Sequence, residues 1–321
     1  MCKNAGKTTV LNRIIQEMGQ SGKKLGLTSI GRDGESVDVV TRTAKPGIYI
    51  YEGTLVATAA DMFPLCDITR EILYTTGWPT PLGEVAVLRA RSDGSVQLAG
   101  PSMTAQLAEL VGLFASFGAE LTIIDGAISR KTLCAPAVSE ATVLCTGASY
   151  SRDMNTVVED TAFAAALLTL PRQTLWTEEE LAWENAPKIR IVRQDGGKEP
   201  LPEGETLAEA LRSPRFAGAK GAFVSGAVTE ALLKPLLQSP VKLEGFELAA
   251  LDGSKLLFPR HVFDKLKLRG VSLRVEKTVK VAAITINPVS AYGFDMDGGE
   301  LLSRMRESVA VPVVNVEREG E

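Results

Sequence analysis

The sequence predicts an α/β protein with a doubly wound, mostly parallel sheet and a second, smaller α/β domain. Over the first half of the chain, short apolar segments typical of strands alternate with segments whose apolar residues recur at helical spacing. A polar stretch rich in glycine and proline follows, and strand and helix patterns resume beyond it. Strands that alternate with helices favour a parallel sheet, and 321 residues are enough for two domains.

The first domain is predicted over residues 1–170. Its first helix is expected to follow Lys7, because apolar residues recur there at helical spacing. A helix is also expected over 53–63, a turn-rich connection over 78–83 and a β-hairpin over 84–99. The other elements are expected as strands at 25–30 and 48–51, a helix at 103–118, strands at 121–125 and 141–145, and a helix at 152–169.

Residues 171–205 are predicted to be a linker or insertion, because they combine an acidic run with the breaker-rich stretch 195–204. The second domain is predicted over 206–321 and is expected to bind a partner or a substrate. Its elements are expected at 221–226, 227–237, 246–258, 260–268, 279–286, 300–306 and 311–316.

Composition excludes several classes of protein. Hydrophobic residues make up 45% and charged residues 23%, which argues against a disordered, collagen-like or coiled-coil chain. The net charge of −4 argues against general nucleic-acid binding or a polybasic membrane surface. The single histidine, His261, argues against a Ser-His-Asp triad or a multi-histidine metal site. Four dispersed cysteines and the lack of a long apolar run predict a soluble cytoplasmic protein with reduced thiols.

The most informative motif comes first in the chain. Residues 1–9, MCKNAGKTT, match the second half of the phosphate-binding pattern G-x-x-x-x-G-K-[ST], with Met1 in place of the first glycine. Gly6 would let the backbone turn towards phosphate, Lys7 would supply a cation, and the Thr8 hydroxyl would bind Mg²⁺. A helix that starts near Lys7 would point its free N–H groups at the anion. The residues expected to bind the nucleotide are Asn4, Ala5, Gly6, Lys7, Thr8 and Thr9.

A second motif supports the first. The apolar run 121–124 ends in Asp125, whose carboxylate would hold Mg²⁺ together with Thr8. On these motifs, residues 1–170 resemble the P-loop NTPases, and within them the branch of MinD-like ATPases and dethiobiotin synthetase. The resemblance implies a magnesium-dependent ATPase. It also implies that Asp33 or Glu35, which follow the strand at 25–30, lies near the γ-phosphate and orients water.

Some features depart from that branch or extend it. The additional lysine of the branch is displaced by one place, at Lys3. The guanine-reading motif Asn-Lys-x-Asp is absent from the chain, which favours ATP over GTP. Arg130, after Asp125, is expected either to contact phosphate or an acidic substrate or to be a solvated loop residue; Arg32 has the same two interpretations. The segments 146–149 and 287–293 follow strands, where a ligand could bind or the chain could simply turn.

A narrower resemblance involves three segments, 28–35, 124–127 and 286–288. They are similar to a family associated with adenosylcobalamin-dependent lysine 5,6-aminomutase, as a proposed reactivase component. This resemblance implies that nucleotide turnover drives the release of damaged cobalamin from a partner mutase.

Three functions are therefore open. The first is an ATPase that couples hydrolysis to a partner protein, with Lys7, Asp33 and Glu35 as catalytic residues. The second is an ATP-dependent kinase or ligase that resembles dethiobiotin synthetase, and the third is a non-catalytic nucleotide-binding subunit. Because the strand before such a loop is central in P-loop folds, we also expect translation to begin upstream of Met1, with a short apolar strand that ends in glycine.

Overall fold

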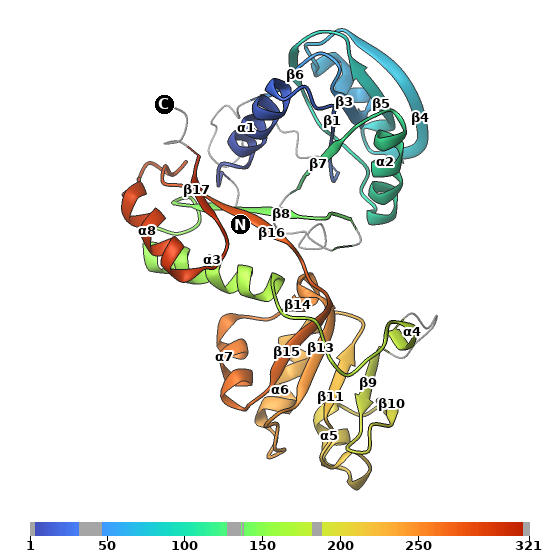
Figure 1. Cartoon of the computed structure of the whole chain (residues 1–321), viewed down its shortest axis with the longest axis vertical. Helices are drawn as coiled ribbons and strands as arrows, with labels where there is room; N and C mark the ends of the chain where they lie inside the picture. The colour runs from blue at the N-terminus through green and yellow to red at the C-terminus, as the bar shows by residue number, and fades with distance from the viewer. Residues whose placement is uncertain (1–3, 32–46, 127–135, 137, 182–187, 317–321) are drawn as a thin grey trace. The chain divides into compact units, whose positions relative to one another are not determined.

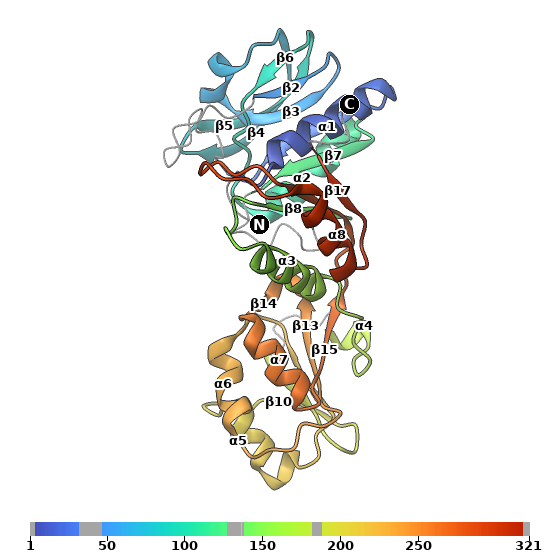
Figure 2. The same ribbon diagram turned by 90° about the vertical axis from the view of Figure 1, so that its left-hand side faces the viewer.

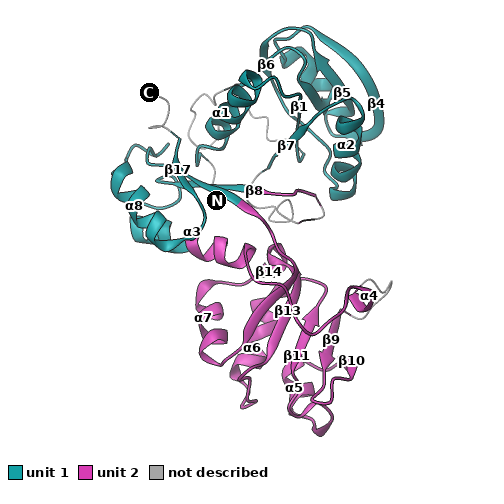
Figure 3. Ribbon diagram, viewed as in Figure 1, with its two compact units in different colours: residues 1–133, 143–161, 282–321 teal, residues 134–142, 162–281 magenta. Residues whose placement is uncertain are grey.

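The computed structural model describes residues 4–31, 47–126, 136, 138–181 and 188–316. The protein is mixed α/β and divides into two compact units, coloured separately in Figure 3. Unit 1 contains residues 1–133, 143–161 and 282–321, and unit 2 contains residues 134–142 and 162–281. The chain therefore passes from unit 1 into unit 2 at residue 134 and again at residue 162, and returns to unit 1 at residues 143 and 282.

The larger sheet of unit 1 has the strand order β4-β5-β3-β1-β7 (Figure 1). Strand β1 is parallel to β3 and to β7, whereas β5 is antiparallel to β3 and to β4. A short antiparallel pair, β2 with β6, accompanies this sheet. The elements are α1 (Lys7–Gln20), β1 (Leu25–Ser29), β2 (Ile48–Ile50), β3 (Leu55–Ala59), η1 (Ala60–Leu65), β4 (Arg70–Thr80), β5 (Gly83–Ala90), β6 (Gly94–Val96), α2 (Thr104–Ser116) and β7 (Leu121–Asp125).

Helices α1 and α2 cover opposite faces of this sheet, because the side chains of its strands alternate. Leu25 and Leu27 of β1 pack in one core cluster with Leu11 and Ile15 of α1. Gly26 lies on the other face, against the ring of Phe114 in α2. Both helices place apolar residues three or four positions apart, so each presents one stripe to the sheet.

Several predicted elements of this region were wrong. The expected helix at 53–63 is strand β3 followed by the 3₁₀ helix η1, and the expected connection at 78–83 is the end of β4 with its turn into β5. Strand β5 forms its hairpin with β4, while β6 pairs with β2. The five residues of β3 are all buried between two strands. A buried strand loses the polar alternation by which strands are recognised, so its apolar run resembles that of a helix.

A smaller sheet of unit 1 has the order β17-β16-β8. Strands β16 and β17 are parallel. At the two ends of β8, the Thr142 N–H donates to the Lys280 carbonyl and the Ala148 N–H to the Asn287 carbonyl, an order that matches parallel pairing with β16. The elements are β8 (Thr142–Gly147), α3 (Met154–Leu168), β16 (Val281–Asn287), α8 (Gly298–Ser308) and β17 (Val313–Asn315).

Unit 2 is built on a sheet of order β10-β9-β11-β13-β15 (Figures 1 and 2). Strands β11, β13 and β15 are parallel, and β9 is antiparallel to both of its neighbours. A two-stranded parallel pair, β12 with β14, completes the set. The elements are α4 (Glu178–Leu181), β9 (Ile189–Val192), β10 (Lys198–Pro200), α5 (Leu207–Arg212), η3 (Pro214–Phe216), β11 (Gly221–Val224), β12 (Val228–Thr229), α6 (Glu230–Gln238), β13 (Glu247–Asp252), η4 (Gly253–Lys255), β14 (Leu256–Leu257), α7 (Arg260–Leu268) and β15 (Ser272–Lys277).

The two faces of the unit 2 sheet are covered differently. Helices α5, α6 and α7 share one core cluster with the sheet, through residues such as Leu211, Leu233 and Leu266. The other face carries Trp176, whose ring centroid lies 6.0 Å from that of Phe223 in β11. The segment that brings Trp176 there is attached to the sheet by hydrogen bonds to the buried carboxylates Glu247 and Glu276.

The units differ from the predicted domain boundaries. Strand β16, helix α8 and strand β17 belong to unit 1, although the sequence places them in a second domain at 206–321. Strands β9 and β10 fall in the predicted linker, but they belong to the unit 2 sheet. The glycines that suggested a linker form the tight turn of the β9–β10 hairpin, where the Arg193 N–H donates to the Gly197 carbonyl at 2.8 Å.

Candidate functional site

The short loop before α1 turns through left-handed residues. Asn4 has φ 60° and Gly6 has φ 82°, so two residues of this short loop adopt left-handed conformations. Gly6 is the N-cap of α1, and Lys7 is the first helical residue. A glycine cap brings no side chain to the first-turn N–H groups, which leaves them directed outwards at the positive end of the helix. Lys7 and Thr8 are half-buried there, and Thr9 is exposed.

Ala5 is buried, whereas the residues on either side of it in the loop are only half-buried. Its side chain is buried in a small cluster with Val10 of α1 and Cys145 of β8. Ala5 therefore anchors the loop against β8, and only its backbone is available to the nucleotide that the sequence predicts.

Asp125 lies at the carboxyl end of β7. It pairs with Ser29 at the end of β1, and its carbonyl accepts a hydrogen bond of 3.1 Å from the Ile30 N–H. This is the position at the end of a parallel strand that the sequence predicts for a metal-binding carboxylate.

Cys145 connects the loop electrostatically with β7. Burial raises the pKa of its thiol above the ordinary value of 9.0, the Thr285 hydroxyl and the Lys7 ammonium oppose this rise, and the Asp125 carboxylate adds to it. Charges on α1 and on β7, far apart in the sequence, thus both act on the same thiol in β8.

Asn287 completes this site on the side of β16. A Cβ atom on Gly6 would lie 3.3 Å from the Cβ of Asn287. Gly147, at the end of β8, approaches even closer: a Cβ there would be 1.9 Å from the Asn287 carbonyl oxygen, which accepts the Ala148 N–H at 2.9 Å. The Asn287 side chain turns its own loop, because Oδ1 accepts the Val289 N–H at 2.9 Å.

The loops after β8 and β16 therefore meet beside the phosphate-type loop. Ser149 and Ala291 join them, since the Ala291 N–H donates to the Ser149 Oγ at 3.2 Å. In the sequence the segments 146–149 and 287–293 are separate candidates, and the second falls in the other predicted domain. No sequence pattern connects Asn287 with Gly6; the available signal is that Asn287 is a polar residue at the end of a buried strand.

The other predicted site residues lie outside the described part of the chain. These are Asp33 and Glu35, expected near the γ-phosphate, and Arg130, expected to contact phosphate or an acidic substrate, together with Arg32. His261 is exposed in unit 2, with its Nε2 3.5 Å from Glu230 Oε1.

The described residues contain no group of three or more His, Cys, Asp or Glu side chains arranged to hold a metal. The magnesium site that the sequence predicts uses only Thr8 and Asp125 from the protein. Mg²⁺ is ordinarily held by one or two protein ligands, with water and substrate phosphates as the others.

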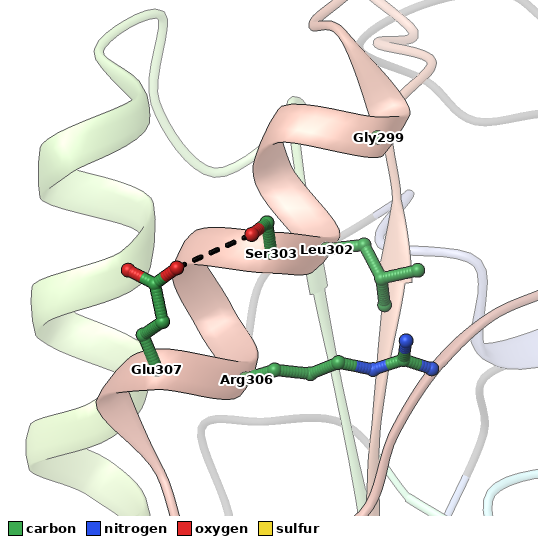
Figure 4. A pocket seen from close by; sticks show the side chains of 5 residues that line it. All are labelled: Gly299, Leu302, Ser303, Arg306 and Glu307. Carbon is green, nitrogen blue, oxygen red and sulfur yellow. Dashed lines mark hydrogen bonds between the residues drawn. The ribbon is translucent and has the colours of Figure 1, made fainter.

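Two open cavities lie elsewhere. One, of about 340 Å³, runs along α8 and is lined by Gly299, Leu302, Ser303, Arg306 and Glu307 (Figure 4). Its polar groups are engaged with one another or with the backbone: the Ser303 hydroxyl bonds to Glu307, and Arg306 donates to the Val313 carbonyl. The other, of about 420 Å³, lies in unit 2 between the end of α3, α7 and β15.

Comparisons with protein-family models, with curated proteins and with solved structures found no match to this chain. The resemblance to P-loop NTPases therefore rests on the residues of the loop and of β7. Among the described residues, no helix combines the length and the apolar character that crossing a membrane requires.

Proposed function

We propose that the chain is a P-loop ATPase that binds Mg-ATP at the start of α1. One observation carries the proposal: Lys7 is the first residue of a helix capped by a left-handed glycine, and its charge acts on the same Cys145 thiol as the charge of Asp125 at the end of β7. Gly6 and the first-turn N–H groups would bind the phosphates, and Lys7 would neutralise their charge. Thr8 and Asp125 would hold Mg²⁺, which supplies charge neutralisation at the phosphates.

The arrangement of the strands is compatible with the doubly wound sheet of such a protein. Strands β1, β3 and β7 are parallel, and helices α1 and α2 cover the two faces of their sheet. In parallel sheets of this kind, ligands bind at the carboxyl ends of the strands. Asp125, Gly147 and Asn287 all lie at such ends.

The proposal extends to a partner. On the resemblance carried by 28–35, 124–127 and 286–288, we propose that ATP turnover acts on a partner protein, an adenosylcobalamin-dependent aminomutase. Unit 2 offers a separate folded unit for such an interaction. Hydrolysis would then change the affinity for the partner by favouring one of two conformational states.

The decisive measurement is titration of the protein with Mg-ATP by calorimetry. Lys7→Ala should weaken binding about 10- to 100-fold, because a charged hydrogen bond contributes about 1.5–3 kcal/mol. Lys23→Ala, which removes an exposed lysine just after the same helix, is the matched control and should bind as the wild type does. An unaltered affinity in Lys7→Ala, or a wild-type protein that binds no Mg-ATP, would sink the proposal.

Turnover and metal use are measured separately. Asp125→Asn should reduce the magnesium dependence of binding, whereas Asp61→Asn, on the exposed surface of unit 1, should leave it unchanged. Steady ATP hydrolysis by the protein alone supports an ATPase. Consumption of ATP only after a small acceptor is added would indicate phosphoryl transfer instead, and ATP bound but never consumed would indicate a binding subunit.

A further inference from the structure

The open cavity of unit 2 lies where one edge of the sheet is only partly covered. Its volume is about 420 Å³, and its walls come from the end of α3, from α7 and from β15. Helix α7 and strand β15 lie side by side in Figures 1 and 2. The segment after α3 covers part of β15, because the Val275 N–H donates to the Pro171 carbonyl at 3.0 Å and the Gln173 N–H to the Val275 carbonyl at 2.8 Å. The cavity runs along residues 272–274, which precede this pairing.

Leu273 directs its backbone groups towards the cavity side of β15. Val275 uses its N–H and carbonyl on the outer side, whereas the Ser272 N–H donates inwards, at 2.9 Å, to the carbonyl that precedes β13. Backbone groups alternate in direction along a strand, so Leu273 faces outwards as Val275 does. The N–H of Val271 is already used, since it donates to the Leu266 carbonyl at 3.0 Å. Between residues 271 and 275 the edge therefore offers one N–H donor, that of Leu273.

A single donor argues against a peptide strand as the occupant. Addition of a strand to a sheet edge uses main-chain hydrogen bonds repeated along several residues, and the edge beyond Leu273 is already paired at Val275. A small molecule needs only a few fixed polar groups to set its orientation, in a cavity of about 300–1,000 Å³. The volume of about 420 Å³ falls in this range.

The charge of the lining favours an anion. Among the described residues that line the cavity, Lys267 and Arg274 are cationic and none is acidic. Arg274 is engaged, because its Nε lies 3.2 Å from Glu247 Oε2 and its Nη1 donates to the Arg172 carbonyl at 3.0 Å. The Lys267 ammonium lies 4.1 Å from the centroid of the Phe263 ring, and within the described part of the chain it enters no ion pair. The charge of Lys267 is therefore available to a ligand.

The rest of the wall is largely apolar and fixed in place. Leu170, Phe263 and Val271 line the cavity, and all three are buried members of the core cluster of unit 2. An apolar group that covers this wall removes apolar surface from water, which favours binding. Because the wall is already packed, binding requires little ordering of the protein.

We propose that this cavity binds a small organic carboxylate with an apolar body. One carboxylate oxygen pairs with the Lys267 ammonium, the other accepts the Leu273 N–H, and the apolar body lies on Leu170 and Phe263. A carboxylate, with two oxygens and one charge, matches one ammonium and one N–H, whereas a phosphate group accepts more donors than the cavity offers. The inference concerns unit 2 alone and does not depend on nucleotide binding.

Titration of the full chain with hexanoate, followed by proton–nitrogen NMR without nucleotide, tests the proposal. The Leu273 amide should shift as hexanoate binds, while the Val275 amide, already bonded to Pro171, should shift less. Hexanamide has a similar body without the charge and should bind about three- to tenfold more weakly, because it loses a partly exposed ion pair. Equal binding of the two compounds, or an unshifted Leu273 amide, overturns the proposal.

Two lysines of α7 provide a matched pair of variants. Lys267→Gln should weaken hexanoate binding by the same factor of about three to ten and leave hexanamide binding unchanged. Lys265→Gln removes another exposed lysine of the same helix, one that does not line the cavity, and should bind hexanoate as the wild type does. Equal weakening in both variants would mean that the general charge of α7 attracts the anion, which contradicts the proposed contact.

Two other probes test the class of ligand. Inorganic phosphate should bind more weakly than hexanoate, and tighter binding of phosphate would overturn the assignment to a carboxylate. An uncharged tetrapeptide of alanine and valine should protect the Leu273 amide from hydrogen exchange less than hexanoate does. Stronger protection by the peptide would indicate strand addition and overturn the proposal of a small-molecule site.

Discussion

A Cβ atom on Gly6 would lie 3.3 Å from the Cβ of Asn287 and 3.4 Å from its Nδ2. The two residues come from opposite ends of the chain, one from the loop before α1 and the other from the end of β16. The conformation of the loop therefore depends on the close approach of Gly6 to the Asn287 side chain as well as on the loop's own sequence. Two features favour glycine at position 6: the left-handed φ of 82°, and the Asn287 side chain, which leaves little space for a Cβ atom.

Gly6→Ala should destabilise the protein by about 1–3 kcal/mol, since it adds left-handed strain and a tight contact with Asn287. Gly22→Ala is the matched control, because Gly22 also has a left-handed φ, 72°, but nothing within 4 Å of an added Cβ. Unfolding in urea should show a larger loss of stability for Gly6→Ala than for Gly22→Ala. Equal losses at the two glycines would show that Asn287 exerts no constraint.

The reactivity of Cys145 should respond in opposite directions to its two charged neighbours. Lys7→Ala removes a charge that lowers the thiol pKa, so alkylation should become slower at pH 8 by about two- to tenfold. Asp125→Asn removes a charge that raises it, so alkylation should become faster by a similar factor. Cys66, whose charged neighbour is Arg70, provides an internal reference measured by mass spectrometry on the same digest. Alkylation rates that change in the same direction in both variants would show that the charges of Lys7 and Asp125 do not determine the reactivity of Cys145.

The same thiol should make stability depend on alkaline pH. Burial raises the pKa of Cys145 in the folded protein, whereas the unfolded chain titrates near 9.0. Between these two values the unfolded state is ionised and the folded state is not, so the free energy of unfolding should fall as pH rises above about 9. Cys145→Ala should have a shallower alkaline decline in urea unfolding, and a slope as steep as in the wild type would contradict this assignment.

Two glycines of unit 1 should have opposite effects on stability. A Cβ on Gly26 would lie 2.7 Å from the ring of Phe114, in the packed layer between β1 and α2. Gly26→Ala should therefore cost about 1–3 kcal/mol in unfolding free energy. Gly112, exposed inside α2, has open space around it, and Gly112→Ala should stabilise the protein by about 0.5–1 kcal/mol. A lower unfolding free energy in Gly112→Ala would contradict the open space around Gly112 on the exposed side of α2.

In unit 2, the guanidinium of Arg172 pairs with one buried carboxylate and one exposed carboxylate. Glu276 and Glu178 each lie 2.7 Å from an Arg172 nitrogen, but their side chains are 8% and 79% exposed. Glu276 also accepts a bond of 2.7 Å from Gln173 Nε2. Glu276→Ala should destabilise the protein by about 1–3 kcal/mol, because it removes the partner of a buried amide.

Glu178→Ala is the control for this comparison, since water replaces its exposed carboxylate, and no change in the urea midpoint is expected. Similar losses in the two variants would mean that burial does not determine the contribution of these carboxylates. Fluorescence of Trp176, which is held by Gln173, gives a local measure of the same change.

Local chemistry explains what could be predicted from the sequence. Glycine before lysine at the start of a helix specifies its own turn and cap, so the loop at Gly6 and the helix after it were predicted correctly. The strands predicted at 25–30 and 121–125 are observed as β1 and β7, because their apolar runs are bounded by polar residues. Asp33, Glu35 and Arg130 stay predictions, since they lie outside the described residues.

What the sequence by itself determined is therefore the loop, its helix and an aspartate at the end of a strand. Tertiary structure alone decided that residues 55–59 form a strand, that β6 pairs with β2, and that the chain returns to unit 1 through β16. The physical reason is that strand pairing joins residues distant in the chain, and the local sequence of a buried apolar strand does not identify the strand with which it pairs. The contact between Gly6 and Asn287 is the clearest example, because no local pattern connects the two residues.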